Sequence, residues 1–200
     1  MAKVEWTCLF DLDGTITRKE ILPEIAREVG IYDEIRELTA QTIQGLIPFH
    51  ESFLRRVEMF RSIPIQRVRE IVAEVPLHEE IVEFMRENAH RSFIVTGNLD
   101  VWVAPLCERI GARYYTSVAR TDNGYVTGVL SVLEKGRVPG LFTGPVVAVG
   151  EGNNDADMIR NASIGIGFGG VHPPAASVMA YATHAIYEEG SLCRFLRQLS

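Results

Sequence analysis

The chain has 200 residues, 46% of them apolar and 23% charged, and this balance excludes a disordered protein because it allows a sizeable core. The formal net charge of −6, without any block of Lys and Arg, argues against nucleic acid as a partner. The length suits one large domain, or a core domain with a smaller inserted one.

The cysteines and the N-terminus bear on the compartment. Cys8, Cys107 and Cys193 are scattered singly, which favours buried thiols in a reducing environment. The first apolar run is too short for a signal peptide, and no apolar stretch approaches the roughly 18 residues that a membrane span requires. We therefore expect a cytoplasmic protein that does not cross a membrane.

The first predicted element is a short apolar strand from Val4 to Phe10 that ends at carboxylates. Its nearly continuous apolar residues are typical of a buried parallel strand. The runs SFIV (92–95), VVAV (146–149) and SIGIG (163–167) have the same form. Because helical segments separate them, we predict an α/β fold with a largely parallel sheet, in which ligands bind beyond the carboxyl ends of the strands.

A long helical region is predicted between the first two strands. Pro48, Pro64 and Pro76 lie at its expected helix boundaries. About sixty inserted residues exceed what a simple crossover needs, so we predict a small helical cap over residues 17–75 and a core of residues 1–16 and 76–200. The residues at helical spacing are Ile35, Leu38 and Ile43, then Phe53, Leu54, Val57 and Phe60, then Val68, Ile71, Val72 and Val75.

Three further segments follow the cap. Residues 79–90 are predicted to form the ordinary crossover helix. Asn123-Gly124, within RTDNGYVTG, predicts a hairpin with a type I′ turn. The segment GRVPGLFTG (136–144) is too rich in Gly and Pro to be a helix.

The motif FDLDGT (10–15) follows the first strand. Asp11 and Asp13 are two residues apart, so an extended backbone would point both side chains the same way. Such close carboxylates repel each other unless a cation neutralises them or one is protonated. An oxygen-rich pair suits Mg²⁺, while a capped turn is the alternative interpretation.

These residue types allow phosphoryl transfer. One carboxylate can attack phosphorus and form an aspartyl-phosphate, and a second can protonate the leaving group and then activate water. The negative charge on the equatorial oxygens of the phosphoryl group must be stabilised by a hydroxyl, an amide and a cation. Thr96, Gly97 and Lys135 could supply these groups. Taken alone, Thr96 could be a plain hydroxyl at a strand end and Lys135 a solvated surface lysine.

The stretch GEGNND (150–155) lies between an apolar strand and the helical ADMIRNA. Glu151 and Asp155 could belong to a polar turn or to a cation site, and sequence position alone leaves both open. The histidines show no metal-ligand spacing, so we expect surface or packing roles for them. They are His50, His78, His90, His172 and His184.

The ordered set of DxDGT, Thr-Gly, a lysine and Gly-acid-Gly-x-Asn-Asp resembles the haloacid dehalogenase superfamily of aspartate-nucleophile phosphatases. A finer similarity, to the phosphoserine phosphatase branch, lies in DLDGTITRKEILPEIAREVG (11–30) and FLRRV (53–57). The resemblance extends over nearly all of the chain. It implies a Rossmann-like core, an inserted cap and a Mg²⁺-dependent phosphatase.

The resemblance also implies roles for particular residues. Asp11 would attack phosphorus, and Asp13 would act as acid and then as base. Thr96, Gly97 and Lys135 would hold the phosphoryl oxygens. The residues implied for the metal site are Asp11, Asp13, Glu151 and Asp155, and Asp13 would contribute its backbone carbonyl. Asn154 and Asp155 would organise substrate and metal-bound water.

Two cap residues would recognise the substrate. The resemblance implies that Glu20 contacts the ammonium and Arg56 the carboxylate of O-phospho-L-serine, and Arg offers a bidentate fork for a carboxylate. Spacing alone would instead allow two solvated helix charges, or a pair formed with each other. Another small phosphorylated metabolite as substrate, phosphoryl transfer to a second acceptor, and a catalytically impaired ligand-binding homologue are the alternative functions.

The chain departs from the family pattern at three points. Glu151 stands where the family has aspartate, so this side chain is one methylene longer. GRVPGLFTG replaces the helix that the family places before the Gly-acid-Gly strand. Thr96 stands where the branch commonly has serine, and both residues carry a hydroxyl.

Overall fold

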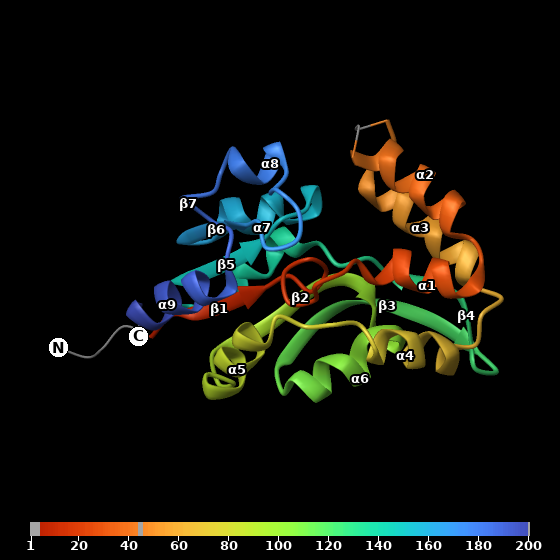
Figure 1. Cartoon of the computed structure of the whole chain (residues 1–200), viewed down its shortest axis with the longest axis horizontal. Coiled ribbons are helices and arrows are strands. Elements are labelled where there is room, and N and C mark those ends of the chain that lie inside the picture. Colours follow the sequence, from red (N-terminus) through yellow and green to blue (C-terminus); the bar gives the residue numbers. More distant parts are fainter. Residues whose placement is uncertain (1–4, 44–45, 200) are drawn as a thin grey trace.

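A computed structural model describes residues 5–43 and 46–199 of the protein, with the side chains of residues 40 and 43 left out (Figure 1). A seven-stranded sheet with the order β4-β3-β2-β1-β5-β6-β7 runs through its centre. All neighbouring strands are parallel except β3 and β4, which confirms the predicted α/β fold. The strands are β1 (Thr7–Phe10), β2 (Ser92–Leu99), β3 (Arg113–Asp122), β4 (Tyr125–Ser131), β5 (Val146–Gly150), β6 (Ile164–Phe168) and β7 (His184–Ile186).

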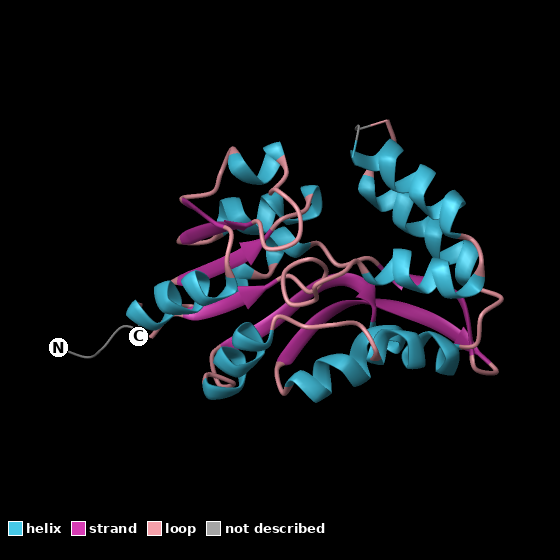
Figure 2. Cartoon of the chain, viewed as in Figure 1, coloured by secondary structure: helices cyan, strands magenta, loops and turns pink. Residues whose placement is uncertain are grey.

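Helices cover both faces of the sheet (Figure 2). Side chains alternate along a strand, so Phe10 joins the apolar cluster on one face while Leu9 joins the cluster on the other. The first face is covered by α5 (Glu79–Glu87), α6 (Asp100–Ile110) and α9 (Glu189–Gln198), and the second by α7 (Ala156–Asn161) and α8 (Ala176–Met179). This double cover explains why the strands are apolar almost throughout.

The region inserted between β1 and α5 is helical, as predicted. It contains α1 (Ile21–Val29), α2 (Tyr32–Ile43), α3 (Phe49–Phe60) and α4 (Ile65–Ala73). Pro48 and Pro64 directly precede α3 and α4, and Pro76 follows α4. The predicted apolar residues with described side chains are buried except Leu54, which is 38% exposed, and the side chain of Ile43 lies outside the described part.

The segment that leads into this insertion and the segment that leads out of it lie side by side. Thr17 and Leu77 form an isolated antiparallel bridge. The amide of Arg18 donates to the Pro76 carbonyl at 2.7 Å, and that of His78 donates to the Ile16 carbonyl at 2.9 Å. Two backbone segments far apart in sequence therefore connect the insertion to the sheet as one paired linker.

Several predicted boundaries change. The Val4 end of the first predicted strand lies outside the described residues, and α5 ends at Glu87 rather than at residue 90. The predicted strand SFIV continues to Leu99, so Thr96 and Gly97 lie inside β2 and not at its end. The pairing of β2 with β3 shifts register between Val95 and Leu99, and such an irregular stretch can re-aim side chains.

The connection from β4 to β5 contains no α-helix, as its Gly and Pro content predicts. Two single-turn 3₁₀ helices, Lys135–Arg137 and Pro139–Leu141, replace it. Val138 is nevertheless buried, and the rings of Phe142 and Phe93 have centroids 4.8 Å apart. These apolar contacts cover the sheet face that a crossover helix would otherwise cover.

Two other predictions are confirmed. Asn123 and Gly124 have φ angles of 48° and 83°, as a type I′ turn between β3 and β4 requires. Cys8, Cys107 and Cys193 are free and buried. Among the described helices, none is both long enough and apolar enough to traverse a lipid bilayer.

We predict that Gly124→Ala lowers the free energy of unfolding by about 1 kcal/mol, because a left-handed backbone conformation is higher in energy for alanine than for glycine. A chemical denaturation curve measures this difference. The matched control is Gly128→Ala in the same hairpin, since no atom lies within 4 Å of a Cβ built at either glycine and only Gly124 has a positive φ. Equal loss of stability in both variants would contradict the role of the turn.

Candidate active site

The polar motifs predicted from the sequence meet at the carboxyl edge of the central strands. Phe10 is in register with Val149 of β5 and Ile94 of β2, so the residues that follow these strands face one another. The Asp11 amide donates to the Val149 carbonyl at 2.9 Å. The next turn is closed by Thr17, whose hydroxyl donates to the Leu12 carbonyl at 3.1 Å and accepts from the Gly14 amide at 3.2 Å.

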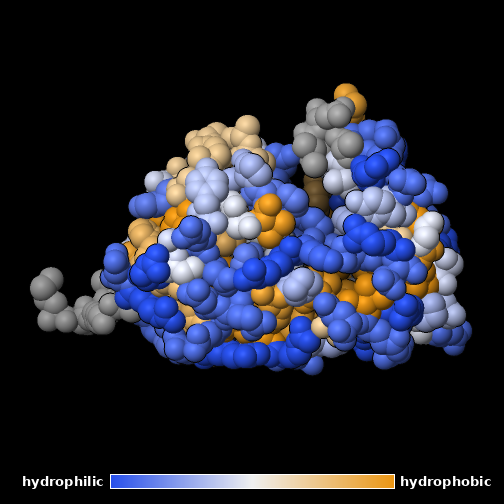
Figure 3. All heavy atoms as spheres, in the orientation of Figure 1, coloured by the Kyte–Doolittle hydropathy of each residue, from blue (hydrophilic) through white to orange (hydrophobic). Residues whose placement is uncertain are grey.

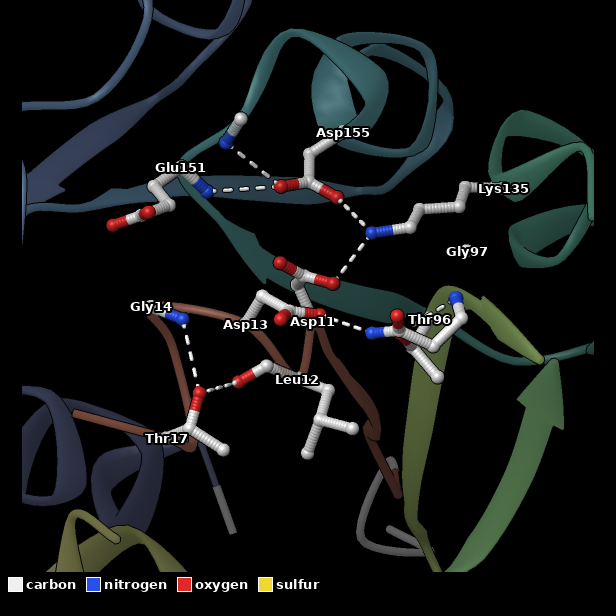
Figure 4. A network of polar contacts seen from close by, with 12 residues as sticks. Asp11, Leu12, Asp13, Gly14, Thr17, Thr96, Gly97, Lys135, Glu151 and Asp155 are labelled. Atoms are coloured by element: carbon white, nitrogen blue, oxygen red, sulfur yellow. Dashed lines mark hydrogen bonds and ion pairs between the residues drawn. The ribbon is translucent and has the colours of Figure 1, made fainter. Parts of the chain in front are cut away.

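Lys135 lies at the centre of the site and is 4% exposed, which excludes a solvated surface lysine (Figure 4). Its ammonium group donates to Asp11 Oδ1, and to Asp155 Oδ1 at 2.7 Å. Burial by itself lowers the pKa of Lys135, but Asp11 and Asp155 together raise this pKa above its usual value. Lys135 therefore carries a positive charge between two buried carboxylates.

The GEGNND stretch is both a turn and part of the site. Asp155 Oδ2 accepts the backbone amides of Glu151 and Gly152, at 3.0 and 2.9 Å. Its other oxygen, Oδ1, accepts a hydrogen bond from the Lys135 ammonium group. Because protein donors already engage both oxygens of Asp155, this residue is better suited to fixing the turn and the lysine than to binding a metal directly.

Asp13 is held between the insertion and β2. Its Oδ1 accepts the backbone amide of Ile21, at the start of α1, at 2.8 Å, and its Oδ2 accepts the side-chain amide of Asn98. Burial, and then the negative charge of Glu20, raise the pKa of Asp13 to about 7. A carboxyl group with a pKa near neutrality can both give and take a proton.

The site holds more buried negative charge than positive charge. Burial raises the pKa of Asp11 to about 8, with the nearby Asp155 as the next cause. Burial, and then Glu20, raise the pKa of Glu151 to about 9. In the described part of the chain, five carboxylates face only the cations of Lys135 and Arg56, so a divalent cation would relieve their repulsion. The five are Asp11, Asp13, Glu20, Glu151 and Asp155.

Glu151 is accommodated by a glycine. A Cβ built on Gly14, whose φ is 67°, would lie 2.1 Å from Glu151 Oε1, so the longer side chain uses space that only glycine leaves open. Glu151 Oε2 is buried and has no hydrogen-bond partner among the described residues. The carboxylates of Asp11 and Glu151, with the neighbouring Asp13, therefore fit the oxygen ligands that Mg²⁺ prefers.

A cavity of about 470 Å³ opens above these carboxylates, on the side of the inserted helices. The space-filling view shows a hollow between α2 and α3 on one side and the α7–α8 region on the other (Figure 3). Seven of the predicted site residues line the cavity, and three do not. The seven are Asp11, Asp13, Glu20, Arg56, Gly97, Glu151 and Asn154, and the three are Thr96, Lys135 and Asp155.

Arg56 faces this cavity from α3. Its Nε is buried without a hydrogen-bond partner among the described residues, and its Nη2 is 3.4 Å from the Thr42 hydroxyl. Burial lowers the pKa of Arg56, although the charges of Glu20 and Asp13 oppose this shift. Within the described part of the chain Arg56 forms no ion pair, so the alternative of a pair with Glu20 is not what the structure contains.

Three residues of the site had no predicted role. Asn98 holds Asp13 in place, and its amide nitrogens lie 3.2 Å from the Thr96 hydroxyl. The Phe49 ring tip lies 3.2 Å from a Cβ built at Gly97, so any larger residue there would crowd it. His172 is exposed, as expected, yet it lines the cavity. Of these, only Asn98 had a signal in the sequence, its position beside Thr-Gly.

Comparison with known proteins agrees with this geometry. The haloacid dehalogenase-like hydrolase family matches residues 8–160. The phosphoserine phosphatase of Methanocaldococcus jannaschii is 29% identical over 184 residues, covering 84% of this chain and 87% of that protein. That of Archaeoglobus fulgidus is 31% identical over 176 residues and covers 80% of this chain, which spans about half of that longer protein.

The fold has a counterpart among solved structures. A substrate-bound phosphoserine phosphatase superimposes with a TM-score of 0.82 at 25% sequence identity, and the match covers 100% of both chains. The sheet and the inserted helices therefore share one arrangement with that protein.

We predict that, without divalent cations, the melting temperature falls by at least about 5 °C between pH 5 and pH 9. The folded-state pKa values of about 7 to 9 exceed those of unfolded carboxyl groups near 4, so stability is complete at low pH and is lost as the acids ionise. Thermal unfolding in EDTA measures the fall, and Mg²⁺ should restore most stability at pH 9.

Glu151→Gln is the control for this pH dependence. It removes one of the titrating groups, so the fall with pH in EDTA should be smaller than in the natural protein. A melting temperature that stays constant or rises toward pH 9 in EDTA would show that the buried acids are not coupled in this way.

Proposed function

This chain belongs to the haloacid dehalogenase-like hydrolase family as a phosphoric monoester hydrolase, and we propose that its substrate is O-phospho-L-serine. The products are L-serine and phosphate, and the reaction passes through an aspartyl-phosphate. One observation carries the proposal: Asp11, which shares the Lys135 ammonium with Asp155, lines the same cavity as Glu20 and Arg56.

Asp11 is the proposed nucleophile. The Lys135 ammonium favours the ionised form of Asp11, against the effect of burial. A carboxylate oxygen then forms a bond to phosphorus while the bond to the serine oxygen breaks. Asp13 gives its proton to the leaving oxygen, and its pKa of about 7 suits this transfer near neutral pH.

The same residues complete the second half of the reaction. Asp13, now ionised, takes a proton from a water molecule that attacks the aspartyl-phosphate. The bond between phosphorus and the Asp11 oxygen breaks, and phosphate leaves. Asn98 and the start of α1 keep Asp13 in position for both transfers through their hydrogen bonds to its two oxygens.

Gly97 and Lys135 are proposed to hold the phosphoryl oxygens. The absence of a side chain at Gly97 lets an anion approach its backbone, and Lys135 supplies the positive charge. We propose that Asn154 also contributes, since its Nδ2 lies 3.8 Å from a Cβ built on Gly97 and it lines the cavity. Thr96 is fully buried behind Asn98, so its hydroxyl acts most directly through that asparagine.

Mg²⁺ is the proposed cofactor. Asp11 and Glu151 would hold it through their carboxylates, and Asp13 through its backbone carbonyl. When bound, it supplies positive charge to the phosphoryl oxygens and keeps Asp11 ionised. Asp155 acts on this group by fixing the Glu151–Gly152 turn.

We propose that residues 17–75 form a cap that recognises the substrate. Arg56 offers two parallel donors to a carboxylate, and its partner-free buried Nε supports such a ligand. Glu20 lines the same cavity and offers a negative charge to the substrate ammonium. Phe49 and Phe53 pack with ring centroids 6.0 Å apart beside these charges and narrow the cavity to a small molecule.

We predict that Asp11→Asn lowers kcat for phosphoserine hydrolysis with Mg²⁺ at least about a thousandfold, because an amide cannot form the acyl-phosphate. Phosphate release over a panel of small phosphate esters measures this loss. Asp157→Asn is the control, since Asp157 is an exposed acid on α7 that pairs with Arg160. A folded natural protein that binds Mg²⁺ but hydrolyses none of the esters would favour the ligand-binding homologue.

We predict that Arg56→Lys lowers kcat/KM for phosphoserine by about 10- to 100-fold, since a bidentate bond to a charged group is lost. Phosphoethanolamine, which has the ammonium but no carboxylate, should be much less affected. Arg55→Lys is the matched control, because Arg55 is the next residue on α3 and is exposed beside Glu51. Equal effects on both esters would remove the phosphoserine assignment while leaving a phosphatase for another metabolite.

A further inference from the structure

A second group of metal-binding side chains lies in the cavity wall, apart from Asp11 and Lys135. Glu20, Glu151 and His172 each offer a ligand atom, and these atoms all lie within 4.8 Å of one another. The three residues come from the segment before α1, the end of β5 and the loop after β6. Among the described residues, no other His, Cys, Asp or Glu group meets this distance.

The fold holds His172 beside Glu151 through its backbone. Gly150 and Gly167 are in register on β5 and β6, so the segments that follow these strands start side by side. The Ala175 amide donates to the Glu151 carbonyl at 2.8 Å, which ties the loop to the turn.

Two glycines allow the loop to take this path. A Cβ built on Gly169 would lie 2.3 Å from the Tyr187 ring, and one on Gly170 would lie 2.5 Å from the Phe168 ring. Pro173 and Pro174 directly follow His172 and restrict its backbone. The position of the imidazole is therefore built into the loop.

The carboxylates of this group lack compensating charge. Glu151 is 6% exposed, and its Oε2 has no hydrogen-bond partner in the described part of the chain. Glu20 lies beside it, with ligand atoms of the two carboxyl groups within 4.8 Å of each other. Two adjacent carboxylates, one with an unused buried oxygen, form a site that needs a cation. Exposed His172 gives the ion a path from solvent.

We propose that Glu20, Glu151 and His172 bind a transition-metal dication of the Zn²⁺ type, at a second site next to the Mg²⁺ site. Mg²⁺ prefers oxygen ligands alone, whereas an imidazole joined to two carboxylates suits Zn²⁺ and Co²⁺. Three protein ligands at the edge of a cavity leave coordination positions for water or a small ligand. Glu151 is thus a proposed ligand of both sites.

This site has a consequence for the substrate, and the consequence depends on the proposed function. Glu20 cannot bind a metal ion and the substrate ammonium at the same time. Zn²⁺ should therefore compete with phosphoserine and raise its KM, while phosphate esters without an ammonium are less affected.

The test is a titration of the natural protein with Co²⁺ in excess Mg²⁺, which keeps the first site filled, followed by the visible absorption of bound Co²⁺. We expect one Co²⁺ to bind with an imidazole ligand, Zn²⁺ to displace it, and His172→Asn to weaken this binding at least about tenfold. The measurement does not depend on catalysis. The second metal site can therefore be disproved while the phosphatase assignment holds, and the phosphatase assignment can be disproved while the second metal site holds.

His90→Asn is the matched control. His90 is exposed, and its Nε2 lies 2.7 Å from Glu5 Oε1, so it represents an imidazole beside a single carboxylate. Binding that His90→Asn leaves unchanged and that His172→Asn and Glu20→Gln both weaken would support the site. The proposal is overturned if the natural protein binds no Co²⁺ beyond the Mg²⁺ site, or if His172→Asn binds Co²⁺ as tightly as the natural protein.

Discussion

The buried ion pairs of Lys135 with Asp11 and Asp155 are the interaction on which the site depends. They connect the end of β1, the turn after β5 and the 3₁₀ segment after β4 through one ammonium group. A buried charge left without a partner costs several kcal/mol, so these three segments are stable together and not separately. The same ammonium also favours the ionised form of Asp11 against the effect of burial, which joins the stability of the strand ends to the reactivity proposed for them.

An excess of buried carboxylates gives the site its second property. Lys135 and Arg56 do not balance five acids. Burial, and then repulsion by neighbouring carboxylates, raise the pKa values of Asp11, Asp13, Glu20 and Glu151. A divalent cation would neutralise this excess negative charge, and Mg²⁺ is the ion we propose. The Glu151 carboxylate lies against Gly14, and its ligand atom lies within 4.8 Å of those of Glu20 and His172.

We propose that the inserted helices both position a catalytic carboxylate and contact the substrate. The hydrogen bond from the Ile21 amide to Asp13 joins the first of these helices to the reacting carboxylates, while Arg56 approaches from α3. The paired linker at Thr17 and Leu77 holds both chain crossings at one place. Specificity for an amino-acid phosphate is therefore proposed to reside in groups whose positions depend on how this insertion meets the sheet.

The sequence by itself determined the α/β fold, the helical insertion, the type I′ turn and the carboxylates at the strand ends, because these follow from local periodicity, turn chemistry and strand order. Motif resemblance also identified Lys135 and Glu151, and the family is confirmed, while the cytoplasmic location stays a prediction. Only the tertiary structure decided that Thr96 is buried behind Asn98 and that His172 meets Glu20 and Glu151. These outcomes depend on a register shift in β2 and on a glycine-rich loop that folds back on β5. Contacts between residues far apart in the chain leave no spacing pattern in the sequence, so only the packed structure reveals them.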